Sequence, residues 1–195
     1  DVVRSERVSQ PSQRLGGRVA VVTGGGRGLG RVAACALAAA GAKVAVLGRG
    51  RDSLEDTAAQ IRDAGGIALA VPADVTQEAD LQAAAAIVKE RLGDCQILVN
   101  NAGAAMVRPF LETDTASLRG LLDVNLVGAL LTARIFGAQM TERRWGRLIN
   151  MASIAGMVGE PNLAVYSASK GALIALTKAL AIEWARYGVT VNALA

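Results

Sequence analysis

The stretch "RVAVVTGGGRGLG", residues 18–30, decides the fold of this chain. Its first part, 18–24, is a short continuous apolar run, which is typical of a strand buried on both faces of a sheet. Glycines 24, 28 and 30 follow, and the pattern then predicts a helix over about 28–40, ended by Gly41. A strand, a glycine-rich turn and a helix in this order predict the first unit of an α/β domain.

The same alternation continues along the rest of the chain. Strands are predicted at 43–48, 68–74, 96–103, 147–153 and 189–195. Helices are predicted from about 52, where Asp52 and Glu55 have capping-box spacing, and at 76–93, roughly 115–143 and about 162–186. This alternation indicates a Rossmann-type, doubly wound α/β fold, with a parallel sheet covered by helices on both faces.

The length of 195 residues fits one domain, predicted over 18–195, with no internal linker or repeat. Residues 1–17 are polar and are expected to form a flexible N-terminal arm. We expect Ala195 to end a central strand, and a C-terminal substrate-covering segment to be missing after it.

The glycine turn is the first candidate binding site. In doubly wound sheets, ligands bind at the carboxyl ends of the strands, and glycines let the backbone approach a pyrophosphate at a helix N-terminus. The spacing here is Gly-x-x-x-Gly-x-Gly, which can also make a plain turn. The strand before it and the helix after it favour nucleotide binding.

Two arginines indicate which dinucleotide is bound. The residue that contacts the adenosine ribose is expected at the end of the second strand, where an acid would favour NAD. This chain has Arg49 there, and Arg27 lies inside the glycine turn. Guanidinium groups suit a 2′-phosphate, so NADP(H) is the preferred cofactor and NAD(H) remains possible. The alternative is that Arg49 and Arg51 only solvate a loop.

Composition narrows the function classes further. Residues 1–51 carry nine Lys/Arg against two Asp/Glu, but aromatic residues make up only 3% of the chain, which disfavours nucleic-acid binding. The chain has no histidine, and Cys35 and Cys95 have no metal-type spacing, so no metal site is expected. No apolar run approaches the ~20 residues of a membrane span. These features predict a cytoplasmic protein without disulfides.

The segment "YSASK", 166–170, is the candidate catalytic motif. Tyr166 and Lys170 are four residues apart and therefore share one helix face. A free tyrosine titrates near pH ~10, and a nearby ammonium group favours its phenolate form. Such a tyrosine can exchange a proton with a carbonyl oxygen, which Ser153 at the end of the fifth strand can also contact. Taken alone, a Tyr-x-x-x-Lys pair is more often a surface pair without chemistry.

These motifs together resemble the short-chain dehydrogenase/reductase family. The resemblance rests on "TGGGRGLG", "NNAG" (100–103), Asn125, Ser153 and "YSASK", and it covers 18–195. Within the family, the chain is most similar to 3-oxoacyl-carrier-protein reductases and gluconate 5-dehydrogenase-like enzymes. The resemblance implies hydride transfer between a nicotinamide and a carbonyl or secondary alcohol, and it implies a homodimer or homotetramer.

The resemblance also assigns roles to residues. It implies a catalytic tetrad of Asn125, Ser153, Tyr166 and Lys170, in which Asn125 supports a water relay to Lys170. The structural reading of Asn125 is a helix irregularity, and the two readings are compatible. It implies cofactor contacts for Asp74, Val75, Asn101, Ala102 and Gly103. The expected cofactor site is therefore Gly24, Arg27, Gly28, Leu29, Gly30, Arg49, Asp74, Val75, Asn101, Ala102, Gly103, Tyr166 and Lys170.

The leading hypothesis is an NADP(H)-dependent carbonyl reductase acting on a small molecule, with neither nucleic acid nor membrane as a partner. A non-catalytic dinucleotide-binding or scaffold protein on the same fold is the alternative, because fold does not imply function. The intact tetrad disfavours that alternative. Residues 154–163 are apolar apart from Glu160 and Asn162, which favours an uncharged or modestly polar substrate.

Overall fold

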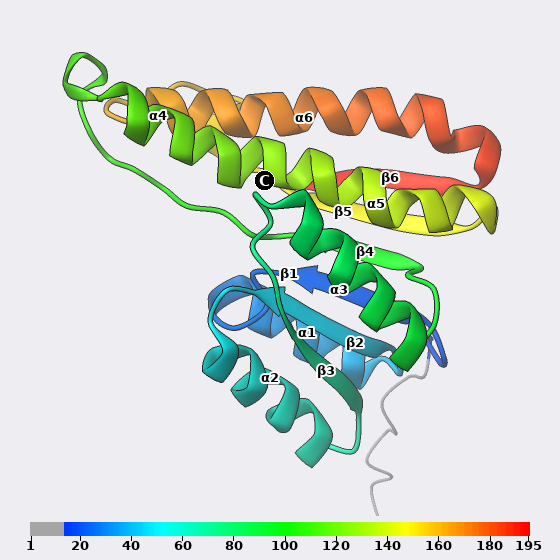
Figure 1. Ribbon diagram of the computed structural model, residues 1–195. Helices are drawn as coiled ribbons and strands as arrows, with labels where there is room; N and C mark the ends of the chain where they lie inside the picture. The colour runs from blue at the N-terminus through cyan, green and yellow to red at the C-terminus, as the bar shows by residue number, and fades with distance from the viewer. Residues whose placement is uncertain (1–13) are drawn as a thin grey trace, which may run out of the picture.

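The computed structural model describes residues 14–195, which form a parallel sheet between two layers of helices (Figure 1). The strands are β1 (Val19–Thr23), β2 (Lys43–Gly48), β3 (Ile67–Pro72), β4 (Ile97–Asn100), β5 (Gly146–Met151) and β6 (Val189–Leu194). Their order in the sheet is β3-β2-β1-β4-β5-β6, and all neighbouring pairs are parallel. The predicted doubly wound α/β fold is confirmed.

The helices are α1 (Gly28–Ala39), α2 (Arg51–Asp63), α3 (Glu78–Arg91), α4 (Thr115–Leu122), α5 (Gly128–Glu142) and α6 (Ala164–Trp184). Apolar residues of α1 and α2 pack with one face of the sheet, and those of α3, α5 and α6 pack with the other. The central strands β1 and β4 are buried at every position, as their continuous apolar sequence predicts.

The start of α2 differs from the prediction. Gly50 is the N-cap residue, and no side chain caps this helix. Glu55 forms an ion pair with Arg62 along the helix surface, so the predicted capping box with Asp52 is wrong. Asp52 lies inside the first turn of α2 and is therefore not at the N-cap position that a capping box requires.

The ends of several strands also differ from the prediction. Residues 73–74 and 101–103 lie in loops after β3 and β4, because pairing in β3 ends at Pro72 and in β4 at Asn100. The sixth strand pairs with β5 and is the last strand of the described sheet.

The predicted arm lies mostly outside the described residues, because residues 1–13 are not described. Residues 14–17 form a turn at the C-terminal end of α1, where the Leu15 amide donates to the Ala40 carbonyl. The Leu15 side chain packs against the core on the α1–α2 face of the sheet.

Two stretches, Thr115–Glu142 and Ala164–Tyr187, are long and apolar enough to cross a membrane by length and composition alone. In this fold they lie on one face of the parallel sheet and bury apolar residues against it. A helix that covers a sheet in an α/β domain has this same apolar character.

Candidate active site

The glycine loop after β1 brings the backbone close to β4. Gly24 has a φ of +63°, and a Cβ there would lie 3.0 Å from the Ala102 Cα. A Cβ on Gly30 would clash with the Gly24 carbonyl oxygen and lie 2.5 Å from Asn101 Nδ2. Gly30 therefore permits close packing of α1 against the loop, and only glycine fits at either position.

The N-terminus of α1 is open at the end of this loop. Arg27 is the N-cap residue, its side chain accepts no capping hydrogen bond, and the first turn carries no acidic residue. The first N–H groups of such a helix are available to an anionic ligand. Gly28 has a φ of +53°, and nothing lies within 4 Å of the position that its Cβ would take. A ligand can therefore approach the backbone N–H groups of this loop directly, without side chains in the way.

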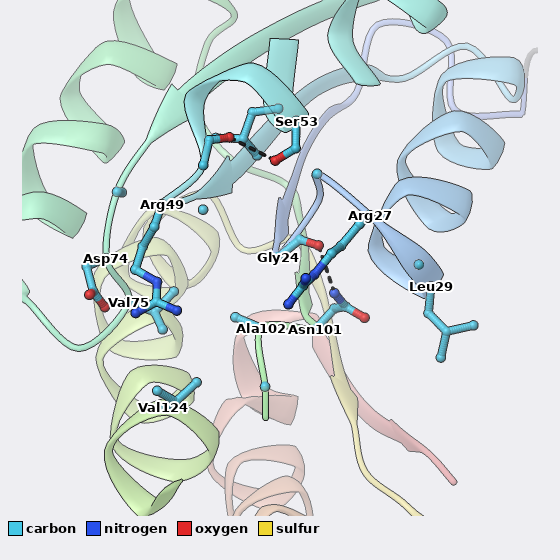
Figure 2. A pocket seen from close by; sticks show the side chains of 17 residues that line it. Gly24, Arg27, Leu29, Arg49, Ser53, Asp74, Val75, Asn101, Ala102 and Val124 are labelled. Carbon is cyan, nitrogen blue, oxygen red and sulfur yellow. Dashed lines mark hydrogen bonds between the residues drawn. The ribbon is translucent and has the colours of Figure 1, made fainter. Parts of the chain in front are cut away.

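A pocket of about 590 Å³ lies above the glycine loop, at the carboxyl ends of β1 to β4 (Figure 2). It is lined by these residues of the expected cofactor site: Gly24, Arg27, Gly28, Leu29, Arg49, Asp74, Val75, Asn101, Ala102 and Gly103. It lies where a doubly wound sheet binds ligands, next to the change of strand order between β1 and β4. Its size, glycine cradle and cationic side chains fit a dinucleotide.

Two loops place arginines in this pocket. Arg27 comes from the loop after β1 and Arg49 from the loop after β2, and Figure 2 shows both side chains in the pocket. Ser53, at the start of α2, also lines the pocket, and its hydroxyl donates to the Gly50 carbonyl at 2.9 Å. On the far side, Asp74 is held by the Thr76 amide and hydroxyl, both bonded to Asp74 Oδ1.

Lys170 is buried beside Tyr166. Only 6% of Lys170 is exposed, and its Nζ donates to the Met151 carbonyl at 2.6 Å. The same Nζ lies 5.7 Å from the centre of the Tyr166 ring. Burial lowers the pKa of Lys170 from its ordinary 10.5, because desolvation disfavours the ammonium form. In the Tyr-x-x-x-Lys pair the lysine is thus buried and the tyrosine half-buried, so the pair is not a fully solvated surface pair.

Asn125 lies in a π-helical segment, Asp123–Val127, between α4 and α5, which confirms the predicted helix irregularity. This residue is fully buried. Its Oδ1 accepts from the Ala104 amide at 2.7 Å, and its Nδ2 donates to the Ala104 carbonyl at 2.9 Å and to Ser169 Oγ at 3.1 Å. The π turn therefore ties the α4–α5 junction to the loop after β4.

Gly103 connects the pocket with this second group of residues. A Cβ on Gly103 would lie 3.3 Å from Asn125 Oδ1 and 3.7 Å from Lys170 Nζ. Gly103 also lines the pocket, so this glycine links the pocket lining with Asn125 and Lys170. Lys170, Tyr166 and Asn125 themselves do not line it.

Ser153 follows β5 and begins the short 3₁₀ turn Ile154–Gly156, with its Oγ accepting from the Ala155 amide at 3.2 Å. Gly156 packs directly on α6, where a Cβ would lie 2.7 Å from the Lys170 carbonyl carbon. This contact brings the turn after β5 against the helix that carries the tyrosine and the lysine.

Sequence reasoning missed some residues of this site. The pocket is also lined by Gly26, Gly48, Gly50, Ser53, Leu54, Ala73 and Val124. Most of them adjoin residues that were predicted, so extending the prediction to whole strand-end loops would have found them. Ser169 had no signal, since its role depends on which face of α6 meets Asn125.

Comparison with known proteins places this site in a family. The family model of the short chain dehydrogenase matches residues 18–195. The chain belongs to this family. Short chain dehydrogenases are NAD(P)-dependent enzymes, so this chain is an oxidoreductase that uses a dinucleotide and acts on a small molecule.

Two relatives illustrate the match. The chain is 42% identical over 184 residues to a galactitol 2-dehydrogenase (L-tagatose-forming) of Cereibacter sphaeroides, covering 93% of this chain and 71% of that protein. It is 37% identical over 182 residues to a 3-oxoacyl-[acyl-carrier-protein] reductase of a Synechocystis species, covering 93% and 74%. The resemblance to 3-oxoacyl reductases is thereby confirmed.

Solved short chain dehydrogenases have the same fold. A gluconate 5-dehydrogenase from Burkholderia cenocepacia, in complex with NADP and tartrate, superposes with a TM-score of 0.89 at 36% identity, covering 95% of this chain and 72% of that one. An NAD⁺-bound xylitol dehydrogenase gives 0.89 at 36% identity, covering 91% and 69%. Similar proteins therefore bind either dinucleotide.

Proposed function

We propose that this protein is an NADP(H)-dependent carbonyl reductase in which Tyr166 is the acid/base. The observation that carries the proposal is the junction at Gly103, where the pocket meets Asn125 Oδ1 and the Nζ of Lys170. The lysine in turn lies against the Tyr166 ring. A dinucleotide lying along the pocket toward this junction would bring its reactive end to the tyrosine.

The residues that hold the cofactor follow from the pocket. The glycine loop and the open start of α1 accept the pyrophosphate. Asp74 and Val75 would contact the adenine, while Asn101, Ala102 and Gly103, which line the pocket, would form the floor. Tyr166 and Lys170 would contact the nicotinamide riboside. The dinucleotide, when bound, supplies or accepts the hydride.

The preference for NADP(H) over NAD(H) rests on charge. Arg27 and Arg49 both line the pocket, Arg27 from the glycine loop and Arg49 from the loop after β2. Neither forms an ion pair with a carboxylate in residues 14–195. Two guanidinium groups without a protein counter-ion suit a dianionic 2′-phosphate.

The chemical step uses the other side chains of the chain. Tyr166 donates its hydroxyl proton to the substrate carbonyl oxygen during reduction and recovers it in the reverse direction. Ser153 donates a hydrogen bond to the same oxygen and orients it. The ammonium group of Lys170 stabilises the phenolate form of Tyr166. Asn125 supports a chain of water molecules through which protons from solvent reach Lys170 and then Tyr166.

The residues after β5 bear on the substrate. Three exposed apolar side chains, Ile154, Met157 and Val158, follow Ser153. They favour an uncharged or modestly polar carbonyl compound over a multiply charged one. The polyol and oxoacyl substrates named for the relatives are within this range.

We propose that the protein forms a cytoplasmic homodimer or homotetramer. A largely apolar groove of about 530 Å³ runs between α5 and α6, and we call it the α5–α6 groove. It is lined by Val127, Leu130, Leu131, Ala133, Arg134, Gly137, Ala138, Thr141, Leu176, Leu180, Glu183 and Trp184. A second copy of the same two helices is the occupant that this family uses, and apolar grooves of this kind are typical of such contacts.

The experiment that tests the function measures NADPH consumption with a panel of ketones and aldehydes. We expect Tyr166→Phe to lose about 100-fold or more in kcat, since general acid catalysis contributes roughly that much, while its affinity for NADPH changes little. Equal turnover by the two proteins contradicts the role of Tyr166. NADPH binding without turnover by either protein favours the alternative, a non-catalytic dinucleotide-binding protein.

A further inference from the structure

Arg31, on α1 just after the glycine loop, bonds that loop to the first turns of α2. Arg27 lies in the glycine loop, and Arg49 lies just before α2. Its Nη2 donates to the Gly26 carbonyl at 2.6 Å, and its Nε donates to the same oxygen at 3.2 Å. Its Nε also donates to Thr57 Oγ1 at 3.0 Å, and its Nη2 reaches the Ser53 carbonyl at 3.4 Å. One guanidinium group therefore bonds the glycine loop on one side and the first turns of α2 on the other.

The partners of Arg31 are themselves fixed. Thr57 is fully buried, and its hydroxyl donates to the Ser53 carbonyl at 3.1 Å. Gly26 lies directly on Ser53, where a Cβ on the glycine would come within 2.6 Å of the serine Oγ. The Arg31 bonds thus hold a close contact between the glycine loop and the first turns of α2.

Arg31 does not line the pocket, and none of its hydrogen bonds goes to a carboxylate within residues 14–195. An effect of Arg31 on the ligand therefore acts through the glycine loop and α2. A guanidinium group suits this position, because its rigid planar fork donates several hydrogen bonds in fixed directions.

We propose that Arg31 is a positioning residue that sets the distance between the glycine loop and the start of α2, so that Arg27 and Arg49 converge on one phosphate group. This inference rests on the proposed NADP(H) preference. Arg27 belongs to the first loop and Arg49 to the second. We call the Arg31 hydrogen bonds to Gly26, Ser53 and Thr57 the joint. If these bonds are lost, the two cations move apart and no longer bind the same phosphate together.

The two cofactors should respond differently to loss of this joint. NADPH needs both loops at the correct separation, because its 2′-phosphate contacts one arginine from each. NADH lacks that phosphate, so its binding depends much less on the position of Arg49 relative to the glycine loop. Removal of Arg31 therefore lowers discrimination between the cofactors more than it lowers the rate of the chemical step.

The test compares steady-state kinetics of the purified wild type and Arg31→Met with NADPH and with NADH. We expect the KM for NADPH to rise about tenfold in the variant, as for the loss of charged hydrogen bonds, with a much smaller rise for NADH and an unchanged kcat. Thr57→Val removes one acceptor of Arg31 with little change of shape, and we expect an intermediate loss of selectivity. Arg62→Met is the matched control, because it removes an exposed guanidinium on α2 that touches neither loop.

Amide hydrogen exchange of the cofactor-free proteins reports on the joint itself. We expect faster exchange in residues 25–30 and 50–57 of Arg31→Met than of the wild type, and no change in Arg62→Met. If the wild type prefers NADPH but Arg31→Met keeps that selectivity, Arg31 has no positioning role and the proposed cofactor preference stands. If the wild type uses NADPH and NADH equally well, the proposed preference for NADP(H) is wrong, and so is the role proposed for Arg31.

Discussion

Lys170 shows how one side chain can serve a site that contains no histidine. Its ammonium group is nearly buried, bonded to the Met151 carbonyl and close to the Tyr166 ring. A charge in this position has a much stronger effect on a neighbouring hydroxyl than the same charge in water, because the surroundings screen it less. The cost of burying it appears as a lowered pKa of Lys170.

That lowered pKa makes a prediction about stability. The folded protein releases the Lys170 proton at a lower pH than the unfolded chain, whose lysine titrates near 10.5. Between these two pKa values the unfolded chain binds more protons, so this residue makes the free energy of unfolding rise with pH. We expect the stability of the wild type relative to Lys170→Met to increase between pH 7 and pH 10.

Urea unfolding of both proteins at several pH values measures this difference. The other titrating groups, such as Cys95, cancel in the comparison of the two proteins. A difference that stays constant or falls as pH rises would show that burial does not penalise the charge of Lys170.

At the scale of elements, the sequence predicted the order and type of the strands and helices because each carries its own apolar period and its own glycine end signals. It also predicted the irregularity at Asn125, but not the hydrogen bonds that fix it. The bridge from Arg31 to Thr57 depends on how α1 packs against α2, which no local pattern encodes. Glu55 and Arg62 lie in one helix, seven residues apart, and the capping-box pattern did not reveal that this ion pair forms instead.

Gly30 gives a prediction about the contact between α1 and β4. A methyl group there meets the Gly24 backbone and the amide of Asn101, neither of which can move freely. We expect Gly30→Ala to destabilise the fold by roughly 1–3 kcal/mol, as overpacking does, and to weaken cofactor binding.

The matched control is Gly120→Ala, because nothing lies within 4 Å of a Cβ at that exposed position of α4. This substitution should stabilise the protein by about 0.5–1 kcal/mol through helix propensity. Thermal unfolding of the two variants measures both effects. Equal stability of Gly30→Ala and the wild type would mean that α1 does not approach β4 so closely.

At the scale of the whole molecule, a parallel sheet gathers residues from distant parts of the sequence at one edge. The glycine loop, Asn101, Ser153 and the α6 pair all lie at or beyond the carboxyl ends of strands, which is why separate motifs form one site. The layer of α5 and α6 lies on one face of the sheet and carries the α5–α6 groove. Self-association through this groove is expected to accompany folding.

The groove gives a prediction about assembly. Ala138 lines it and is exposed, so Ala138→Glu places a charge in the proposed contact. We expect this variant to sediment as a smaller species than the wild type at the same concentration. Val32→Glu is the control, because Val32 is 65% exposed on α1, away from the groove. An unchanged sedimentation coefficient for Ala138→Glu would exclude this groove as the contact between copies.

The most direct test of the central claim follows the hydride itself. A carbonyl substrate from the panel is incubated with NADPH in which both hydrogens at the nicotinamide C4 are replaced by deuterium, and the alcohol is analysed by mass spectrometry. We predict that deuterium appears on the former carbonyl carbon with the wild type and that Tyr166→Phe, although it still binds NADPH, forms little labelled alcohol. An alcohol without deuterium, or equal labelling by both proteins, would contradict the account.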